Sequence, residues 1–78
     1  MKVDYNVKGF IDLLNERGIK YEITNDFCFY TIHFGKYEVM YEPGDIFINA
    51  YFDGKQIDYD WQDYGQTWIP ITLFKDVF

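Results

Sequence analysis

The chain has 78 residues, of which 49% are hydrophobic and 23% aromatic, and its 13 acids against 7 bases give a net charge of −6. Domains usually hold about 50 to 200 residues, so this length predicts a single domain, 1–78, around one core. The apolar content excludes an intrinsically disordered chain, and the negative charge disfavours direct binding to nucleic acid or anionic lipid.

Residues 7–17 have the period of an amphipathic helix. The apolar residues at i, i+3, i+4 and i+7 form one stripe, which comprises Val7, Phe10, Ile11 and Leu14. Asn6 is a suitable N-cap, and Gly18 stands where a left-handed residue ends a helix in a Schellman motif. We therefore predict a helix whose apolar stripe faces a sheet.

After Gly18 the apolar period changes from 3.6 to 2, which indicates strands. Four two-residue turn signals divide this part of the chain, namely Asn25-Asp26, Gly35-Lys36, Pro43-Gly44 and Asp53-Gly54. They delimit five strands, at about 19–24, 27–34, 37–42, 45–52 and 55–61. Consecutive strands joined by such short turns predict an antiparallel meander.

Two-residue turns also fix the register of each hairpin. They pair Phe34 with Tyr37, Glu42 with Asp45 and Phe52 with Lys55. The resulting rows place the apolar residues on one face, for example in the row Ile19, Ile32, Val39, Ile48 and Tyr59 and in the row Tyr21, Tyr30, Tyr41, Ile46 and Trp61. Agreement among the four turns predicts an α+β fold, in which the N-terminal helix packs on the apolar face of a five-stranded antiparallel meander.

The C-terminal residues 67–74 are β-prone but contain Pro70, which cannot donate a ladder hydrogen bond. We expect a short edge strand or extended tail there, with a helical turn over 71–77 as the alternative.

The opposite face of the predicted sheet mixes carboxylates with Phe29, Met40 and Phe47. An apolar stripe rimmed by charge is typical of a contact surface. The alternative is that the C-terminal segment, with Trp68, Phe74 and Phe78, folds back over the stripe.

The negative charge is concentrated in residues 37–63, which hold seven acids and one lysine and so account for the whole net charge. On one surface of the predicted sheet Glu38, Glu42, Asp58 and Asp60 would form a lattice of carboxylates, which can resemble nucleic-acid phosphates to a basic protein. The alternative is a solubilising surface that blocks edge-to-edge aggregation.

The segment 58–68 interleaves acids with aromatic residues and has the composition of a protein-recognition loop. Its candidate contact residues are Asp63, Tyr64 and Trp68, although Trp68 and Tyr64 are equally consistent with packing at the end of the sheet. We expect Trp61 to be a core residue.

Catalytic chemistry has little support in the sequence. There is no serine, and the one histidine, His33, is predicted opposite Glu38 as a cross-strand pair. The lone Cys28 lies in an apolar run, so we expect a buried thiol and no disulfide. We predict no enzyme activity, no metal site and no cofactor.

The chain shows neither a signal-peptide pattern nor a membrane-spanning stretch, so we expect a cytoplasmic location. Small, acidic, aromatic-rich single domains without catalytic motifs resemble the inhibitors that bacteriophages and plasmids use against host nucleic-acid enzymes, including anti-restriction and anti-CRISPR proteins. This likeness is one of composition and involves no specific residues. It implies an inhibitor of a basic, nucleic-acid-binding host enzyme.

The surface of this predicted inhibitor comprises Glu38, Glu42, Phe47, Asp58, Asp60, Asp63, Tyr64 and Trp68. The alternative is a homo-oligomeric structural or accessory subunit, a homodimer in the simplest case, that packs through Phe29, Met40 and Phe47.

Overall fold

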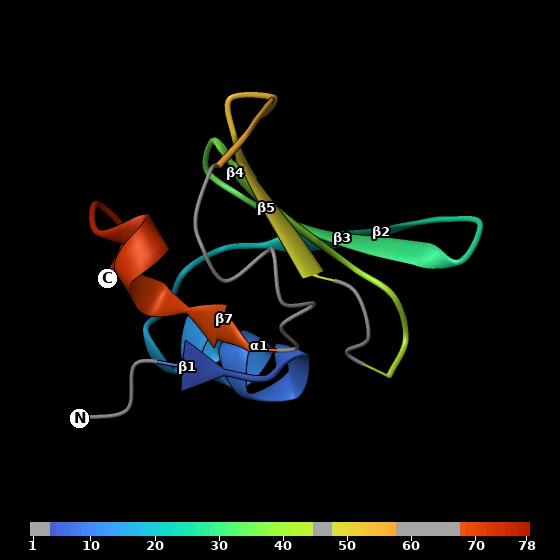
Figure 1. The fold of residues 1–78 in the computed structure, drawn as a ribbon. Helices are drawn as coiled ribbons and strands as arrows, with labels where there is room; N and C mark the ends of the chain where they lie inside the picture. Colours follow the sequence, from blue (N-terminus) through green and yellow to red (C-terminus); the bar gives the residue numbers. More distant parts are fainter. Residues whose placement is uncertain (1–3, 45–47, 58–67) are drawn as a thin grey trace.

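The protein is an α+β structure in which one helix and the C-terminal segment pack on the same face of an antiparallel sheet (Figure 1). The computed structural model describes residues 4–44, 48–57 and 68–78. The predicted fold class, an N-terminal helix on a five-stranded antiparallel sheet, is confirmed. Within the described residues, no helix has the length and apolar character needed to cross a membrane.

Helix α1 (Val7–Glu16) begins and ends at the predicted signals. The Asn6 side chain accepts a hydrogen bond of 2.8 Å from the Gly9 N–H, and a Cβ at Gly9 would lie 2.9 Å from the same oxygen. The close approach of the Asn6 side chain therefore explains why a glycine stands at position 9.

At the C-terminal end of α1, Gly18 has φ +68° and its N–H donates to the Asn15 carbonyl, while the Ile19 N–H donates to the Leu14 carbonyl. This pair of bonds is the Schellman motif.

The main sheet has the order β2 (Glu22–Asp26), β3 (Phe29–Phe34), β4 (Tyr37–Tyr41), β5 (Ile48–Phe52) and β6 (Lys55–Gln56). Every neighbouring pair is antiparallel, as a meander requires. Two predicted turns are confirmed, because Phe34 pairs with Tyr37 and Phe52 with Lys55. The fifth strand was expected to reach residue 61, but β6 ends at Gln56, and residues 58–61 lie outside the described part.

The registers of the other two hairpins differ from the prediction. The β2–β3 turn is Phe27-Cys28 and not Asn25-Asp26, so Ile32 faces Ile23 in place of Ile19. The reason is local, since the Asn25 side-chain amide donates to the carbonyls of Phe27 and Phe29, at 3.2 and 3.0 Å, and closes the later turn.

In the β4–β5 hairpin, Val39 faces Ala50 in place of Ile48, so the predicted register of this hairpin is wrong; Asp45, the predicted partner of Glu42, lies outside the described residues. The connection is therefore longer than two residues. Both errors are shifts by an even number of residues, and even shifts keep each side chain on its face. The described residues predicted for the inner face therefore do lie on it, although their predicted cross-strand partners in these two hairpins were wrong.

The C-terminal segment forms both of the elements that were predicted as alternatives, a short strand and a helical turn. Strand β7 (Ile69–Pro70) pairs with β1 (Asp4–Tyr5) in a separate two-stranded sheet, and the 3-10 helix η2 (Ile71–Phe74) follows at once. The sequence did not predict β1. Phe74 and Phe78 pack against Phe10 of α1, so the alternative in which they fold back over the apolar stripe of the other sheet face is wrong.

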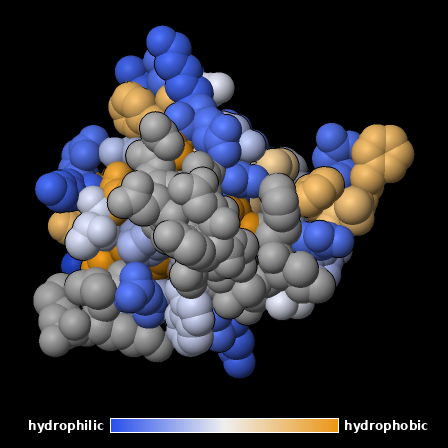
Figure 2. All heavy atoms as spheres, viewed as in Figure 1, coloured by the Kyte–Doolittle hydropathy of each residue, from blue (hydrophilic) through white to orange (hydrophobic). Residues whose placement is uncertain are grey.

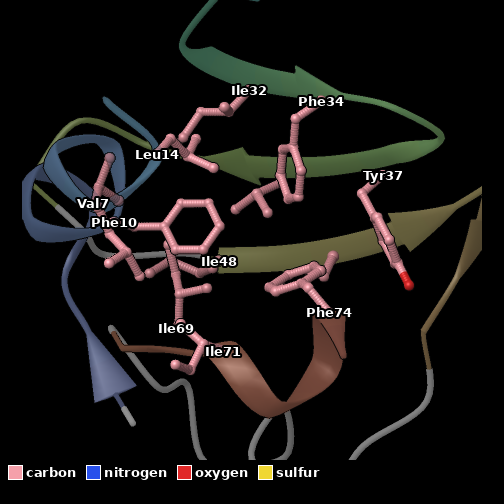
Figure 3. Packing of buried hydrophobic residues seen from close by; sticks show 13 residues of the cluster. Val7, Phe10, Leu14, Ile32, Phe34, Tyr37, Ile48, Ile69, Ile71 and Phe74 are labelled. Atoms are coloured by element: carbon pink, nitrogen blue, oxygen red, sulfur yellow. The ribbon is translucent and has the colours of Figure 1, made fainter. Parts of the chain in front are cut away.

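The core lies between the sheet, α1 and η2, and Figure 3 shows side chains from all three converging there. We call the sheet face that carries Ile32, Val39 and Ala50 the inner face; these three are at most 1% exposed. Three phenylalanines, Phe10, Phe34 and Phe74, meet with ring centroids 5.3–5.6 Å apart. Such tilted and edge-on contacts are favourable beyond the area they bury.

Tyr37 closes one end of this core, and its hydroxyl donates to the Asp76 carboxylate at 3.0 Å. Burial, the hydrogen bond and the negative charge of Asp76 raise the pKa of Tyr37 above its ordinary value of 10.0. A pKa that is higher in the folded state means that this contribution to stability is complete below pH 10.0 and is lost as the pH rises through the folded-state value.

Tyr37→Phe is therefore expected to lower the free energy of unfolding by about 1 kcal/mol at neutral pH, through loss of the hydrogen bond. It should also reduce the decline of stability at alkaline pH. Urea unfolding of both proteins near pH 7 and above pH 10 measures the two effects. An equally steep alkaline decline in Tyr37→Phe and wild type would contradict this account.

The β2–β3 hairpin projects from the body of the molecule and exposes its turn (Figure 1). Phe27 is 95% exposed and has φ +58°, and Cys28 beside it is exposed as well. The expectation of a buried thiol is wrong because Cys28 belongs to the turn and not to a strand. Figure 2 shows apolar atoms gathered at this projecting tip.

Candidate functional site

The sheet face opposite the core, which we call the outer face, is acidic. Its residues follow from the observed registers and are Glu22, Thr24, Asp26, Phe29, Thr31, His33, Glu38, Met40, Asn49, Tyr51 and Gln56. They include three carboxylates and neither lysine nor arginine. The outer face therefore presents negative charge without a compensating base other than His33.

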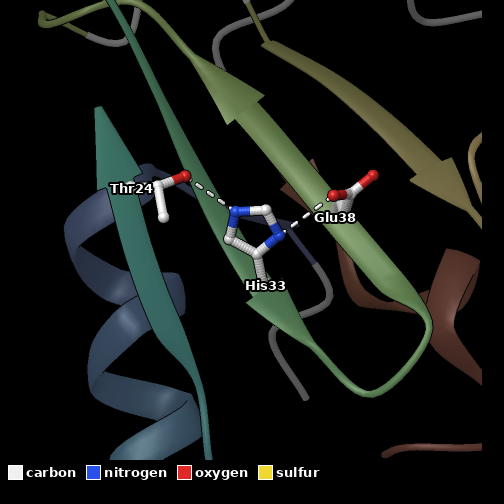
Figure 4. A network of polar contacts seen from close by, with 3 residues as sticks. All are labelled: Thr24, His33 and Glu38. Atoms are coloured by element: carbon white, nitrogen blue, oxygen red, sulfur yellow. Dashed lines mark hydrogen bonds and ion pairs between the residues drawn. The ribbon is translucent and has the colours of Figure 1, made fainter. Parts of the chain in front are cut away.

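A hydrogen-bonded chain of three side chains crosses β2, β3 and β4 on this face (Figure 4). His33 Nδ1 lies 2.9 Å from a Glu38 carboxylate oxygen, and His33 Nε2 lies 2.7 Å from the Thr24 hydroxyl. The predicted His33–Glu38 pair is confirmed. The Thr24 contact was missed because the predicted register placed Thr24 at the end of its hairpin.

The order hydroxyl, imidazole, carboxylate is also that of nucleophile, base and orienting acid in hydrolytic triads. Here the side chains of His33 and Glu38 are each 36% exposed on a sheet face. The neighbouring strands β3 and β4 have partners on both sides, so their backbone N–H groups form the ladder and are not free to bind an oxyanion. We interpret the two contacts as cross-strand bonds that hold the register of β2 on β3 and of β3 on β4.

Apolar side chains alternate with these polar groups. Met40 lies between Thr31 and Asn49 and is half-buried, and Tyr51 lies between Glu38 and Gln56. The Gln56 side chain donates to that of Asn49 at 3.1 Å across β5 and β6. The outer face thus combines fixed polar groups with partly exposed apolar area, which is the usual mixture of a protein contact surface.

The structure describes three of the eight predicted contact residues. Glu38 is on the outer face, and Glu42 is half-buried one position after β4. Trp68 is 43% exposed and directly precedes β7, which belongs to the other sheet. The remaining five lie outside the described residues, namely Phe47, Asp58, Asp60, Asp63 and Tyr64.

Two acids that the sequence did not single out join Glu38 on the outer face. Glu22 faces His33 from β2, on the side opposite Glu38, and Asp26 ends the same strand. Strands are spaced about 4.8 Å apart, so Glu22 and Glu38 are roughly 10 Å from each other. The observed turn at Phe27-Cys28 is what places them there, and the Asn25 side chain was the available signal for it.

Among the described residues, no group of three or more His, Cys, Asp or Glu side chains is arranged to hold a metal ion. No protein-family model matches the chain, and no curated protein and no solved structure match it either.

Proposed function

We propose that this protein is an inhibitor that binds another protein and covers a basic, nucleic-acid-binding surface of a host enzyme with its acidic outer face. The observation that supports the proposal is that this face carries Glu22, Asp26 and Glu38 and neither lysine nor arginine. A basic surface that has evolved to bind phosphates attracts such a face over long range.

The composition of the outer face also favours a partner that differs from the chain itself. Self-association through this face, the alternative raised by the sequence, would bring the carboxylates of two copies together and remove them from water. Paired like charges are destabilising when desolvated. A partner with lysines or arginines would instead form ion pairs with Glu22 and Glu38, while Met40 and Tyr51 supply apolar contact.

The predicted residues beyond the described part belong to the same proposal. Asp58, Asp60 and Asp63 would extend the negative charge, and Phe47 and Tyr64 would act as aromatic anchors. Their contribution is a prediction from the sequence.

The proposal is tested by capture from a host lysate on the immobilised protein at low salt, followed by elution with duplex DNA. We expect DNA to displace the captured enzyme, because DNA and this protein compete for the same basic surface of the enzyme.

The double variant Glu38→Gln/Glu42→Gln is expected to slow association by about 3- to 10-fold with little change in dissociation. Biosensor kinetics with the captured enzyme measure both rates.

The matched control is Asp12→Asn/Glu16→Gln, which removes the same charge from exposed positions of α1. It should slow association far less. Capture that DNA does not displace, or equal rates in the two double variants, would contradict the proposed function.

A further inference from the structure

The outer edge of β2 is open to solvent within the described part of the chain. β2 pairs with β3 on one side and is the terminal strand of the sheet on the other. All five of its residues are exposed. An edge strand directs alternate N–H and C=O groups outward, and natural edges are commonly protected by lysine, proline or a bulge. β2 contains neither residue, its five pairs with β3 are continuous, and its charged side chains, Glu22 and Asp26, are both acidic, so they repel an acidic strand and attract a basic one. Such an edge is a template for strand addition.

Charge argues against a second copy of this chain as the added strand. In an antiparallel pair of two β2 strands centred on Thr24, Glu22 of each copy would lie opposite Asp26 of the other. Like charges directly opposite each other in a ladder are destabilising. The same two acids would stabilise lysine or arginine at positions four residues apart in an incoming strand.

The two faces of β2 specify the rest of the incoming segment. Ile23 is 40% exposed and lies on the inner face opposite the fully buried Ile32. An apolar side chain next to Ile23 would extend the apolar layer of the sheet by one strand, whereas the basic side chains would lie on the outer face beside Glu22 and Asp26. The matching segment is therefore extended, basic on one face and apolar on the other.

Phe27, directly after β2, indicates that this end of the hairpin contacts another molecule. A bulky side chain at φ +58° is sterically unfavourable, and one that is 95% exposed gains almost nothing from burial. Folding of this chain alone does not account for a phenylalanine at this position. An apolar side chain of a bound strand that extends past Asp26 would give the ring a partner.

We propose that the free edge of β2 binds an extended basic segment of another protein by strand addition, with lysine or arginine beside Glu22 and Asp26 and an apolar side chain beside Ile23. This site shares Glu22 and Asp26 with the outer face but is formed by the backbone edge of β2, and the proposal does not depend on the function proposed above. The interface is small, which predicts weak, reversible binding.

The peptide Val-Lys-Val-Thr-Val-Lys-Val matches this pattern and serves as the probe. Titration into the isotope-labelled protein, followed by NMR, should shift the backbone amides of residues 22–27. Strand addition uses only alternate peptide N–H groups. Methylating one alternate set of peptide amides is therefore expected to weaken binding by about ten-fold or more, and methylating the other set by less than about two-fold.

Two variants test the side-chain contribution. Glu22→Gln/Asp26→Asn is expected to weaken peptide binding by about five-fold, whereas the control Asp12→Asn/Glu16→Gln should leave it nearly unchanged. Phe27→Asn should weaken binding without lowering stability, because asparagine tolerates the left-handed region.

Equal effects of the two methylation patterns, shifts confined to other strands, or a dimer of the free protein paired through β2 would each overturn the proposal. None of these results bears on displacement of a captured enzyme by DNA, so the two proposals fail separately.

Discussion

Val39→Asp is expected to unfold the protein. Val39 is fully buried at the centre of the inner face, between Ile32 of β3 and Ala50 of β5. Among the described residues no polar or charged side chain is buried, so a carboxylate at this position would lack a basic partner and would lose its hydration. Burying an unpaired charge costs more than about 4 kcal/mol, which is most of the stability of a domain of this size.

The neighbouring residue supplies the control. Met40 follows Val39 in β4 but lies on the outer face and is half-buried. Met40→Asp introduces the same group and is expected to cost about 1 kcal/mol or less, because the carboxylate stays hydrated. Circular dichroism and urea unfolding of the two variants measure the difference. Similar losses in both would show that the assignment of inner and outer faces is wrong.

Phe74→Ala is expected to lower the free energy of unfolding by about 3–5 kcal/mol. Phe74 is fully buried in η2, and its ring centroid lies 5.0 Å from that of Tyr37 and 5.3 Å from that of Phe34. The substitution removes a large apolar side chain and leaves a cavity where the sheet, α1 and the C-terminal segment meet. The physical cause is the loss of both transfer free energy and packing.

Thr72→Ala is the matched control, since Thr72 is an exposed residue of the same short 3-10 helix. Its expected effect is within about 0.5 kcal/mol. Urea unfolding followed by fluorescence and by circular dichroism gives both values. A small effect of Phe74→Ala would mean that the C-terminal segment is not part of the cooperative core.

The candidate site was only partly accessible to sequence reasoning. The pair His33–Glu38 was predicted because the Gly35-Lys36 turn between them is short and unambiguous. Glu22, Thr24 and the exposed Phe27 were missed, since all three depend on the turn that Asn25 closes by bonding two carbonyls. A turn signal in the sequence restricts a hairpin to a few adjacent registers, and the side-chain hydrogen bonds decide among them.

The sequence by itself determined the helix with both its caps, the order of the five strands and the face to which each strand directs its apolar residues. These features follow from periods of 3.6 and 2 and from local turn residues, so they need no knowledge of distant contacts. Only the tertiary structure decided the registers of the first and third hairpins, the pairing of β1 with β7 and the position of the C-terminal phenylalanines. The Asn25 side chain selects the register of the first hairpin locally, whereas the β1–β7 pairing and the position of the C-terminal phenylalanines arise from contacts between residues far apart in the chain. Several arrangements bury the same apolar face, and packing against Phe10 and Phe34 selects the one that fills the core.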